Sequence, residues 1–586
     1  MNFLKLEKTF CNPILACLLI VLTCAVIYSN SLDGPFLFDD NRAIAEKEKI
    51  REVSNFLRFD QIRTKRPFVD LTFALNYRFG QLNVRPYHVI NVLIHMMTGV
   101  IVYFLSCAIL RRLLRPTGDP RSIFHHESQN TRHNAPIPLI GLFTALIFVT
   151  HPLQTQAVTY ICQRYASLAA LFYLTSVLCY LKGRMVQRAR ISGEISGKKV
   201  GLSEVRRSRY AVTAQLFVLY SLCVLSGILA FLSKQNAASL PLAIILVEVL
   251  CIDNSWAGWK KKLPWTGLAL LLMVTAVLLA TGKLEGMGTL ADLLEDISRQ
   301  TRGLGSEAVV TRWNYLCTQF MVVILYIRLL FLPLGQNADP MLPFTTGFFD
   351  GTTPLAFLFF LAIILFAIRV RKKMPALTFG IFWFFITLSV ESSVIPIKDA
   401  MFEHRLYLPM FGFAIGLCTT VFQRLSRHPF WAVVLLVCVT FLLGGATYHR
   451  NRIWLSAEAL WTDVLSKSPH NYRAHTNLGT AFLKEGKLKD AHEHFQESLR
   501  LKQLSDAHFN LGLSFERFGD LGTAEGHYRK AVEMDPGNKK ALVNLGVILS
   551  GQGKFEEAAR LFQQALKFDP RSFVAHVNLG FARMNR

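Results

Sequence analysis

The amino-acid sequence predicts an all-α protein in two parts, a polytopic membrane domain of helices over residues 1–450 and a helical repeat solenoid over residues 451–586. Hydrophobic residues make up 52% of the 586 positions. The mean hydropathy of +0.32 exceeds that of most soluble globular chains. The apolar residues gather in stretches long enough to cross ~30 Å of hydrocarbon. In the last part, a short Asn-Leu-Gly sequence recurs at a nearly constant spacing, which predicts the solenoid.

The apolar stretches give the order of the expected membrane helices. Each is close to the roughly 18 to 22 residues that a spanning helix needs. They cover residues 12–30, 89–110, 137–153, 160–181, 211–231, 237–252, 265–281, 313–334, 354–369, 375–392, 406–423 and 430–447. The first stretch is longer than the apolar core of a typical signal peptide, so we expect an uncleaved first helix.

Basic residues at the ends of these stretches predict the side of each loop. Runs such as RRLLR at 111–115, KKK at 260–262 and RVRKK at 369–373 favour the cytoplasm by the positive-inside rule. The first outer loop then covers residues 31–88 on the far side. A full crossing by residues 313–334 would put RVRKK outside, so we expect a re-entrant or broken segment there. About eleven spans then place the repeats on the outer side as well.

Charge and cysteine usage exclude several classes of protein. The net charge of +24 is concentrated at membrane ends, so it indicates topology and contact with membrane lipids rather than nucleic-acid binding. The eleven cysteines lie in or beside apolar stretches, which predicts no disulfide framework. The sequence has no P-loop, no G-x-G-x-x-G, and no H-x-x-x-H or C-x-x-C pattern. We therefore expect neither a nucleotide cofactor nor a metal site.

The second part has the period of tetratricopeptide repeats. Asn-Leu-Gly begins at residues 477, 510, 544 and 578, and a spacing of 33 or 34 residues is typical of these helix pairs. The small residues Ala491, Ala524 and Ala558 permit close helix crossing, and the large residues Phe495, Tyr528 and Phe562 fill the space beside them. We expect three full repeats flanked by partial ones. Such arrays present a concave peptide-binding surface; a spacer packed on the membrane domain is the alternative.

The predicted outer loops contain more charged and polar side chains than a simple connection requires. Asp39 and Asp40 lie just beyond the first span in the apolar sequence FLFDDNRAI. Charge at membrane depth is costly and is usually functional or tightly paired. Carboxylates in one loop and cations in several others suggest a site that removes a proton and holds an anion. The candidate residues are Asp39, Asp40, Arg66, His151, Arg164, Lys234, Arg312, Glu403, His404, Arg405 and Tyr407.

Asp40 and three other polar side chains of this region also have structural interpretations. Asp40 could cap a helix that begins at NRAIAEKEK. Arg78 and Arg85 fit lipid-headgroup anchors, and His95 fits a hydrogen-bonded histidine of an apolar core.

Six motifs in chain order resemble the transmembrane and tetratricopeptide-repeat-containing O-mannosyltransferases and their bacterial relatives. The motifs are FLFDDNRAI, RPFVDLTFALNYRFG, YHVINVLIH, HPLQTQAVTYICQR, FLSKQNAASLP and EHRLYLPMFGF. The likeness runs along nearly the whole chain and includes the repeats. It departs at the last motif, where the family's animal members read roughly E-R-V-L-Y and this chain has Glu403-His404-Arg405. Ser233-Lys234-Gln235 replaces S-K-E.

This resemblance implies a GT-C fold and an inverting glycosyltransferase. The enzyme would transfer a sugar, mannose in the family, from a polyprenyl-phosphate-linked donor to Ser or Thr hydroxyls of an exported protein. No cofactor is required, and the lipid-linked sugar is the donor substrate. The membrane would be the bacterial inner membrane with loop one and the repeats in the periplasm, or the endoplasmic reticulum with lumenal repeats in a eukaryote. The repeats would recruit the acceptor protein.

The chemistry of that transfer suits the outer-loop residues. A carboxylate within ~3 Å of the acceptor hydroxyl can take its proton, and we expect Asp39 in this role with Asp40 as the alternate. The leaving lipid phosphate gains negative charge that cationic donors stabilise. The expected phosphate ligands are Arg405, His404, Lys234, Arg164 and Arg66, and the further candidates are Glu403, His151, Tyr407 and Arg312.

Two other functions fit parts of the sequence. An enzyme of the O-antigen ligase or polymerase kind would share the topology and the donor but transfer to glycan, which analysis of the acceptor distinguishes. A membrane-anchored repeat scaffold without activity would be indifferent to replacement of Asp39.

Overall fold

The computed structural model describes residues 12–56, 66–114, 136–195, 202–252, 310–392, 397 and 399–585, together with the single positions 267 and 271. The described residues form helices and no strand, which confirms the all-α fold class. They divide into two compact units. Unit 1 comprises Met1–Gln336 and Leu342–Trp454, and unit 2 comprises Asn337–Met341 and Leu455–Arg586. The division falls close to the expected boundary at residue 450, but the short segment Asn337–Met341 packs with the repeats.

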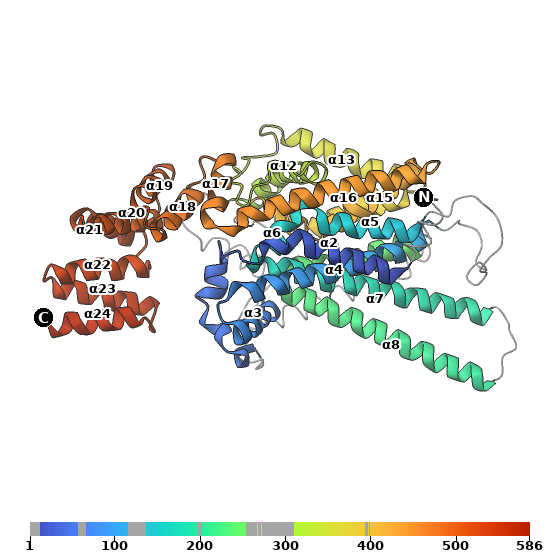
Figure 1. The fold of residues 1–586 in the computed structure, drawn as a ribbon, viewed down its shortest axis with the longest axis horizontal. Helices are drawn as coiled ribbons and strands as arrows, with labels where there is room; N and C mark the ends of the chain where they lie inside the picture. Colours follow the sequence, from blue (N-terminus) through green and yellow to red (C-terminus); the bar gives the residue numbers. More distant parts are fainter. Residues whose placement is uncertain are drawn as a thin grey trace. The chain divides into compact units, whose positions relative to one another are not determined.

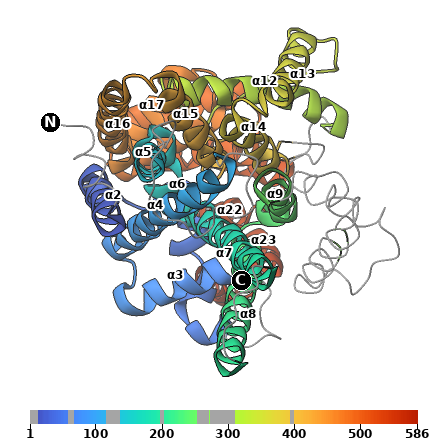
Figure 2. The same cartoon turned by 90° about the vertical axis from the view of Figure 1, so that its right-hand side faces the viewer.

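Unit 1 is a helical bundle. Its helices are α2 (Pro13–Tyr28), α3 (Pro67–Gly80), α4 (Val84–Leu113), α5 (Ile137–Thr150), α6 (Thr155–Val158), α7 (Arg164–Ile195), α8 (Leu202–Ser233), α9 (Leu240–Val247), α12 (Arg312–Phe331), α13 (Thr353–Val370), α14 (Pro375–Leu388), α15 (Met410–Arg424) and α16 (Pro429–Asn451). Figures 1 and 2 show α4, α5, α7 and α16 running in a common direction through the bundle.

The described residues contain eight helices long and apolar enough to cross a membrane, or nine if the bent pair 137–150 and 152–158 is one span. The helix α14 is apolar but shorter. Of the predicted span 265–281 only positions 267 and 271 are described, so the total of about eleven spans stays a prediction.

The segment 313–334, predicted to be re-entrant or broken, contains the continuous helix α12. The helix has no break, and its re-entrant placement stays a prediction. The described break lies instead between Ile137–Thr150 and Pro152–Val158, which are bent by 53°. Both ends of α12 contact predicted outer loops. The Tyr315 hydroxyl donates to the Glu391 carbonyl at 2.9 Å, and the Leu330 carbonyl accepts from His151 at 3.0 Å. Figure 1 shows α12 crosswise to α13 and α16.

The predicted outer loops meet at one end of the bundle, which we call the loop-one end. Asn30, after α2, donates to the Tyr448 carbonyl in α16 at 2.8 Å. The Asp39 N–H donates to the Tyr160 hydroxyl at 2.9 Å, which joins loop one to the start of α7. The Tyr160 ring also stacks on Trp454, with centroids 5.4 Å apart. The chain therefore leaves unit 1 for the repeats at the end that bears Asp39.

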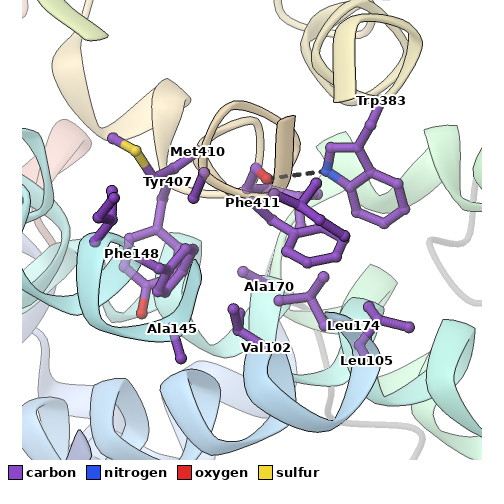
Figure 3. Packing of buried hydrophobic residues seen from close by; sticks show 14 of the residues in the cluster. Val102, Leu105, Ala145, Phe148, Ala170, Leu174, Trp383, Tyr407, Met410 and Phe411 are labelled. Carbon is purple, nitrogen blue, oxygen red and sulfur yellow. Dashed lines mark hydrogen bonds between the residues drawn. The ribbon is translucent and has the colours of Figure 1, made fainter. Parts of the chain in front are cut away.

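Close helix contacts in the core fix this arrangement. Gly380 of α14 lies against Gly412 of α15, and a Cβ on Gly380 would approach the Gly412 carbonyl oxygen to 2.2 Å. Small residues let apolar helices approach closely inside a membrane. Beside this crossing, Figure 3 shows Trp383 and Phe411 packed together, with ring centroids 5.0 Å apart. The Trp383 indole N–H donates to the Leu408 carbonyl at 3.2 Å, so the buried polar atom is satisfied.

Unit 2 is the predicted repeat array. Its helices are α17 (Ala457–Lys467), α18 (Tyr472–Lys484), α19 (Leu488–Leu501), α20 (Ser505–Phe518), α21 (Leu521–Met534), α22 (Lys539–Gly551), α23 (Phe555–Phe568) and α24 (Phe573–Met584). Each Asn-Leu-Gly glycine of the three pairs faces the large residue of the next helix. A Cβ on Gly512 would lie 2.7 Å from the Tyr528 ring. The close crossing expected from the small and large residues is therefore present.

Candidate active site at the loop-one end

The two adjacent carboxylates of loop one have opposite environments. Asp39 is exposed, and no side chain among the described residues pairs with its carboxylate. Asp40 is buried, and its carboxylate accepts the Leu37 N–H at 3.1 Å and the Cys162 N–H at 2.6 Å. Burial raises the pKa of Asp40 to about 8, against the two backbone hydrogen bonds, so the group is largely protonated at neutral pH. Asp39 is thus the accessible carboxylate.

The helix-cap interpretation of Asp40 is wrong. Asp40 precedes a short helical turn, Asn41–Ala45, but its side chain makes no capping hydrogen bond to that turn. It turns back to Leu37 and across to Cys162 instead.

Phe38, directly before the pair, has a φ of +54°. A bulky residue in the left-handed region is strained, and such strain persists where the surroundings hold it. Here the Phe38 ring packs edge-on against Tyr160, with centroids 5.7 Å apart. This contact and the bond from the Asp39 N–H to the Tyr160 hydroxyl hold the backbone at Phe38 and Asp39.

A buried cluster of charged side chains lies in the other loops of the same end. The Lys234 ammonium, after α8, lies 2.7 Å from the Glu391 carboxylate. The Arg405 guanidinium holds its own loop by donating to the carbonyls of Ala400 at 2.9 Å and Asp399 at 2.8 Å. Lys234 and His404 both lie within electrostatic reach of Arg405 and Arg66. The fold therefore brings together four of the five predicted phosphate ligands.

His404 is a neutral member of this cluster. Burial, with the charges of Lys234, Arg405 and Arg66, lowers its pKa well below the ordinary range. Gln156 accepts hydrogen bonds through its Oε1 atom from the His404 N–H at 2.8 Å and from Nδ1 at 3.2 Å. The imidazole therefore carries its proton on Nδ1 and contributes no positive charge.

Arg66 connects the two halves of the site. It lies within electrostatic reach of Cys162, whose N–H binds Asp40, and also of Lys234 and His404. Its guanidinium lies 4.2 Å from the centroid of the Tyr165 ring. The side chain is half-buried rather than fully enclosed.

Arg164, the fifth predicted phosphate ligand, is fully buried among internal acceptors. Its guanidinium donates to Asn91 at 2.7 Å, to Asn76 at 2.6 Å, to the Tyr87 carbonyl at 2.9 Å and to Thr72 at 3.2 Å. These bonds tie α7 to α3 and α4.

Two further candidates are held within the bundle. His151 uses both ring nitrogens, accepting the Leu153 N–H at 3.3 Å and donating to the Leu330 carbonyl at 3.0 Å. The Tyr407 hydroxyl bonds His95 at 2.7 Å in the core, where Figure 3 shows Tyr407 beside Phe148. His95 is thus a hydrogen-bonded core histidine.

The last two candidates differ in exposure. Glu403 is buried and accepts from Gln336 at 3.0 Å. Arg312 is exposed in the first turn of α12.

Sequence reasoning missed Glu391, the carboxylate that pairs with Lys234. A single acidic residue at the end of the apolar stretch 375–392 was the available signal, because such a charge needs a partner at that depth. The described residues contain no group of three or more His, Cys, Asp or Glu around a common metal position. The Asp39 carboxylate can accept a proton, and Lys234, Arg405 and Arg66 can place positive charge near a bound anion.

Comparison with known proteins agrees with this description. The tetratricopeptide repeat family model matches residues 448–506, 478–539 and 509–573. A protein O-mannosyl-transferase of Caenorhabditis elegans is 25% identical and aligns with 83% of this chain and 62% of its own length. The protein O-mannosyl-transferase Tmtc3 of Drosophila melanogaster is 24% identical, over 83% of this chain and 55% of its own. The chain thus spans about half to three fifths of the length of these relatives.

Among solved structures, the crystal structure of MamA covers 22% of this chain at 20% identity, with a TM-score of 0.21. The sequence relatives cover both the membrane domain and repeats, and they confirm the family resemblance that the loop motifs predict.

Proposed function

Starting from the relation of this chain to the repeat-containing O-mannosyltransferases, we propose that it is a membrane glycosyltransferase. It transfers a sugar, mannose by similarity, from a polyprenyl-phosphate-linked donor to Ser or Thr hydroxyls of an exported protein. The observation that supports this most is the asymmetry of the loop-one pair. Asp39 is exposed at the loop-one end, which also holds Arg66, Lys234 and Arg405, while Asp40 is buried and largely protonated.

In the proposed reaction, the acceptor hydroxyl attacks the anomeric carbon of the donor and gives its proton to Asp39. The bond from that carbon to the phosphate oxygen breaks, the electron pair remains on the lipid phosphate, and the anomeric centre inverts. Arg66, Lys234 and Arg405 stabilise the charge that develops on the phosphate. His404, being neutral, orients through a hydrogen bond. No step requires a metal.

The lipid chain of the donor lies between the apolar helices of unit 1, and the acceptor approaches at the loop-one end. The repeats bind the acceptor protein as an extended segment. This division of roles predicts that removal of residues 470–586 weakens acceptor use and leaves binding of the lipid donor unchanged. Loss of donor binding in a folded truncated chain would contradict it.

The loop-one end and the repeats face the outer side of the membrane. A single cysteine at the exposed position Gly526, in a chain lacking other reactive cysteines, should react with an impermeant maleimide in intact cells or sealed vesicles of outer-side-out orientation. Labelling only after permeabilisation would show that the repeats face the cytoplasm and would contradict the proposed topology.

The decisive test replaces Asp39 by Asn. The amide keeps the size of the side chain but cannot take the hydroxyl proton, so turnover should fall by ~10²–10⁴-fold while donor binding persists. Asp40→Asn is the matched control and should retain most of the activity. Normal turnover in Asp39→Asn with loss of turnover in Asp40→Asn would identify Asp40 as the general base. Normal turnover in both variants would show that neither carboxylate of loop one takes the proton.

A further inference from the structure

Two buried amide side chains adjoin the charged cluster of the loop-one end. Gln319 lies in the second turn of α12 and is 2% exposed. Asn236 lies two residues after Lys234, in the short helical turn Gln235–Ser239, and is 7% exposed. The transfer reaction described above gives neither amide a role.

Gln319 is a neighbour of Arg405. Its Nε2 atom donates to the Ala400 carbonyl at 3.1 Å, and the Arg405 guanidinium donates to the same oxygen atom at 2.9 Å. Tyr315, four residues before Gln319 on the same side of α12, also interacts with Arg405. The amide and the guanidinium therefore lie side by side.

Asn236 is in the same way a neighbour of Lys234. Its Nδ2 atom donates to one oxygen atom of the Glu391 carboxylate at 3.3 Å. The other oxygen atom of that carboxylate lies 2.7 Å from the Lys234 ammonium. The Tyr315 hydroxyl donates to the Glu391 backbone carbonyl at 2.9 Å. Both amides thus belong to one network that includes both cations.

The oxygen atoms of the two amides, Asn236 Oδ1 and Gln319 Oε1, have no hydrogen-bond partner in the described part of the chain. The orientation of each amide follows from its partner, because a carbonyl or an ionised carboxylate only accepts and the NH₂ group must face it. A buried acceptor without a donor is unfavourable. Two such acceptors beside two cations indicate a ligand that combines hydroxyl groups with a negative charge.

We propose that Asn236 Oδ1 and Gln319 Oε1 accept hydrogen bonds from hydroxyl groups of the sugar ring of the donor. This inference rests on the proposed function, in which Lys234 and Arg405 bind the phosphate of the lipid-linked sugar. The sugar is bonded directly to that phosphate, so its hydroxyls lie near amides that adjoin the same cations. An ionised phosphodiester has no proton to donate to an amide oxygen, whereas each sugar hydroxyl has one.

The assignment divides recognition of the donor into two parts. The cations bind the phosphate of a polyprenyl-phosphate lipid, and the amides select lipids whose phosphate carries a hydroxylated sugar. A site built to bond a hydroxyl discriminates against a ligand that lacks it, because the buried acceptor then stays unpaired. Asn236 and Gln319 are therefore specificity-determining residues.

Equilibrium binding of two lipids to the detergent-solubilised full chain tests the inference. One lipid is polyprenyl-phosphate mannose, and the other is a polyprenyl methyl phosphodiester, which has the same charge and no sugar. Gln319→Met keeps a similar size without the acceptor, and Arg405 still donates to the Ala400 carbonyl. The variant should bind the mannosyl lipid about tenfold more weakly and the methyl lipid with unchanged affinity. Its melting temperature should equal or exceed that of the wild type.

Thr318→Val is the matched control from the same turn of α12. The Thr318 hydroxyl already donates to the Asn314 carbonyl at 2.8 Å and accepts the Thr345 N–H at 3.0 Å. This variant should lose stability and bind both lipids like the wild type. Wild-type affinity of Gln319→Met for the mannosyl lipid would overturn the inference, and so would an equal loss for both lipids. If the wild type binds neither lipid, the proposed function fails and this inference fails with it.

Monodeoxy analogues of the mannosyl lipid provide a second test, which pairs each amide with one hydroxyl. For the analogue that lacks the hydroxyl bonded to Gln319, the wild type and Gln319→Met should bind with similar affinity, because the same interaction is already lost. Asn236→Leu should identify a different hydroxyl in the same way. Losses that add for every analogue would show that the amides do not contact the sugar.

Discussion

The ammonium of Lys234 lies 2.7 Å from the carboxylate of Glu391, and both side chains are almost completely enclosed at the loop-one end. Asn236 also donates to Glu391, at 3.3 Å. The pair joins the loop after α8 to the loop after α14. In the proposed reaction the Lys234 ammonium leaves the Glu391 carboxylate and binds the phosphate of the donor. The pair therefore contributes both to the stability of the fold and to transfer activity, and mutation can separate the two contributions.

A double-mutant cycle should separate them. Breaking a buried ion pair by removing one partner typically costs about 3–5 kcal/mol, so we expect lower melting temperatures for Lys234→Met and for Glu391→Leu. The double variant Lys234→Met/Glu391→Leu should recover most of the stability and none of the transfer activity. Thermal unfolding in detergent measures the first effect and a transfer assay the second. Additive losses in the double variant would mean that the two groups do not interact.

The pKa of Asp40 predicts a dependence of stability on pH. Because the folded-state pKa of about 8 is higher than its ordinary 3.8, folding favours the protonated form. The stability that this provides is complete below about pH 4 and declines as the pH rises to 8, by up to about 1.4 kcal/mol per pH unit. The melting temperature of the wild type should therefore decrease as the pH is raised from 5 to 8.

Asp40→Asn cannot lose a proton, so its melting temperature should change less over the same range. Asp33→Asn is a suitable control, because Asp33 is exposed and paired with Arg85, and its profile should follow the wild type. A parallel decline in Asp40→Asn and in the wild type would assign the pH dependence to other groups.

Arg164 and Arg66 should behave differently when each is replaced by Gln. Arg164→Gln leaves several buried acceptors without a donor, at about 1–3 kcal/mol each, so we expect little folded protein in size-exclusion chromatography. Arg66→Gln removes a half-buried charge beside Tyr165 and should preserve folding. Its affinity for the lipid donor should decrease about tenfold or more, as expected for a hydrogen bond to a charged group. If Arg164→Gln is well folded and binds the donor less tightly, Arg164 is a phosphate ligand, as the sequence predicts, and not only a structural residue.

Two glycines of the second repeat provide a test of packing. A Cβ on Gly512 would lie 2.7 Å from the Tyr528 ring, whereas Gly526 of α21 has open space around it. Gly512→Ala should lower the stability of the repeats by about 1–3 kcal/mol through overpacking. Gly526→Ala should raise it by up to about 1 kcal/mol through helix propensity. Hydrogen exchange within α20 and α21 measures both changes, and equal protection in the two variants would contradict the close crossing.

Local sequence patterns were enough to predict the features of this protein that follow from the length of apolar stretches and from a regular residue spacing. The length of the apolar stretches gave most helices of unit 1, and the spacing of 33 or 34 residues gave the repeat pairs, down to the glycine beside Tyr528. The asymmetric distribution of Lys and Arg predicted that Asp39, Lys234 and Arg405 lie at one end. These properties depend on each segment's own composition, so a single chain is enough to predict them.

The roles of individual side chains depended on tertiary neighbours. Asp39 and Asp40 are identical in sequence terms, and only the Cys162 N–H and the burial around Asp40 distinguish them. Arg164 and Arg66 are both cations of outer loops, yet one is enclosed by acceptors and the other is half-buried. The two amides were likewise invisible, since Asn236 and Gln319 adjoin one charged cluster only after α12 packs against the loops. Burial and hydrogen bonding join residues far apart in the chain, and therefore the pKa, accessibility and charge of these groups follow from the packed fold.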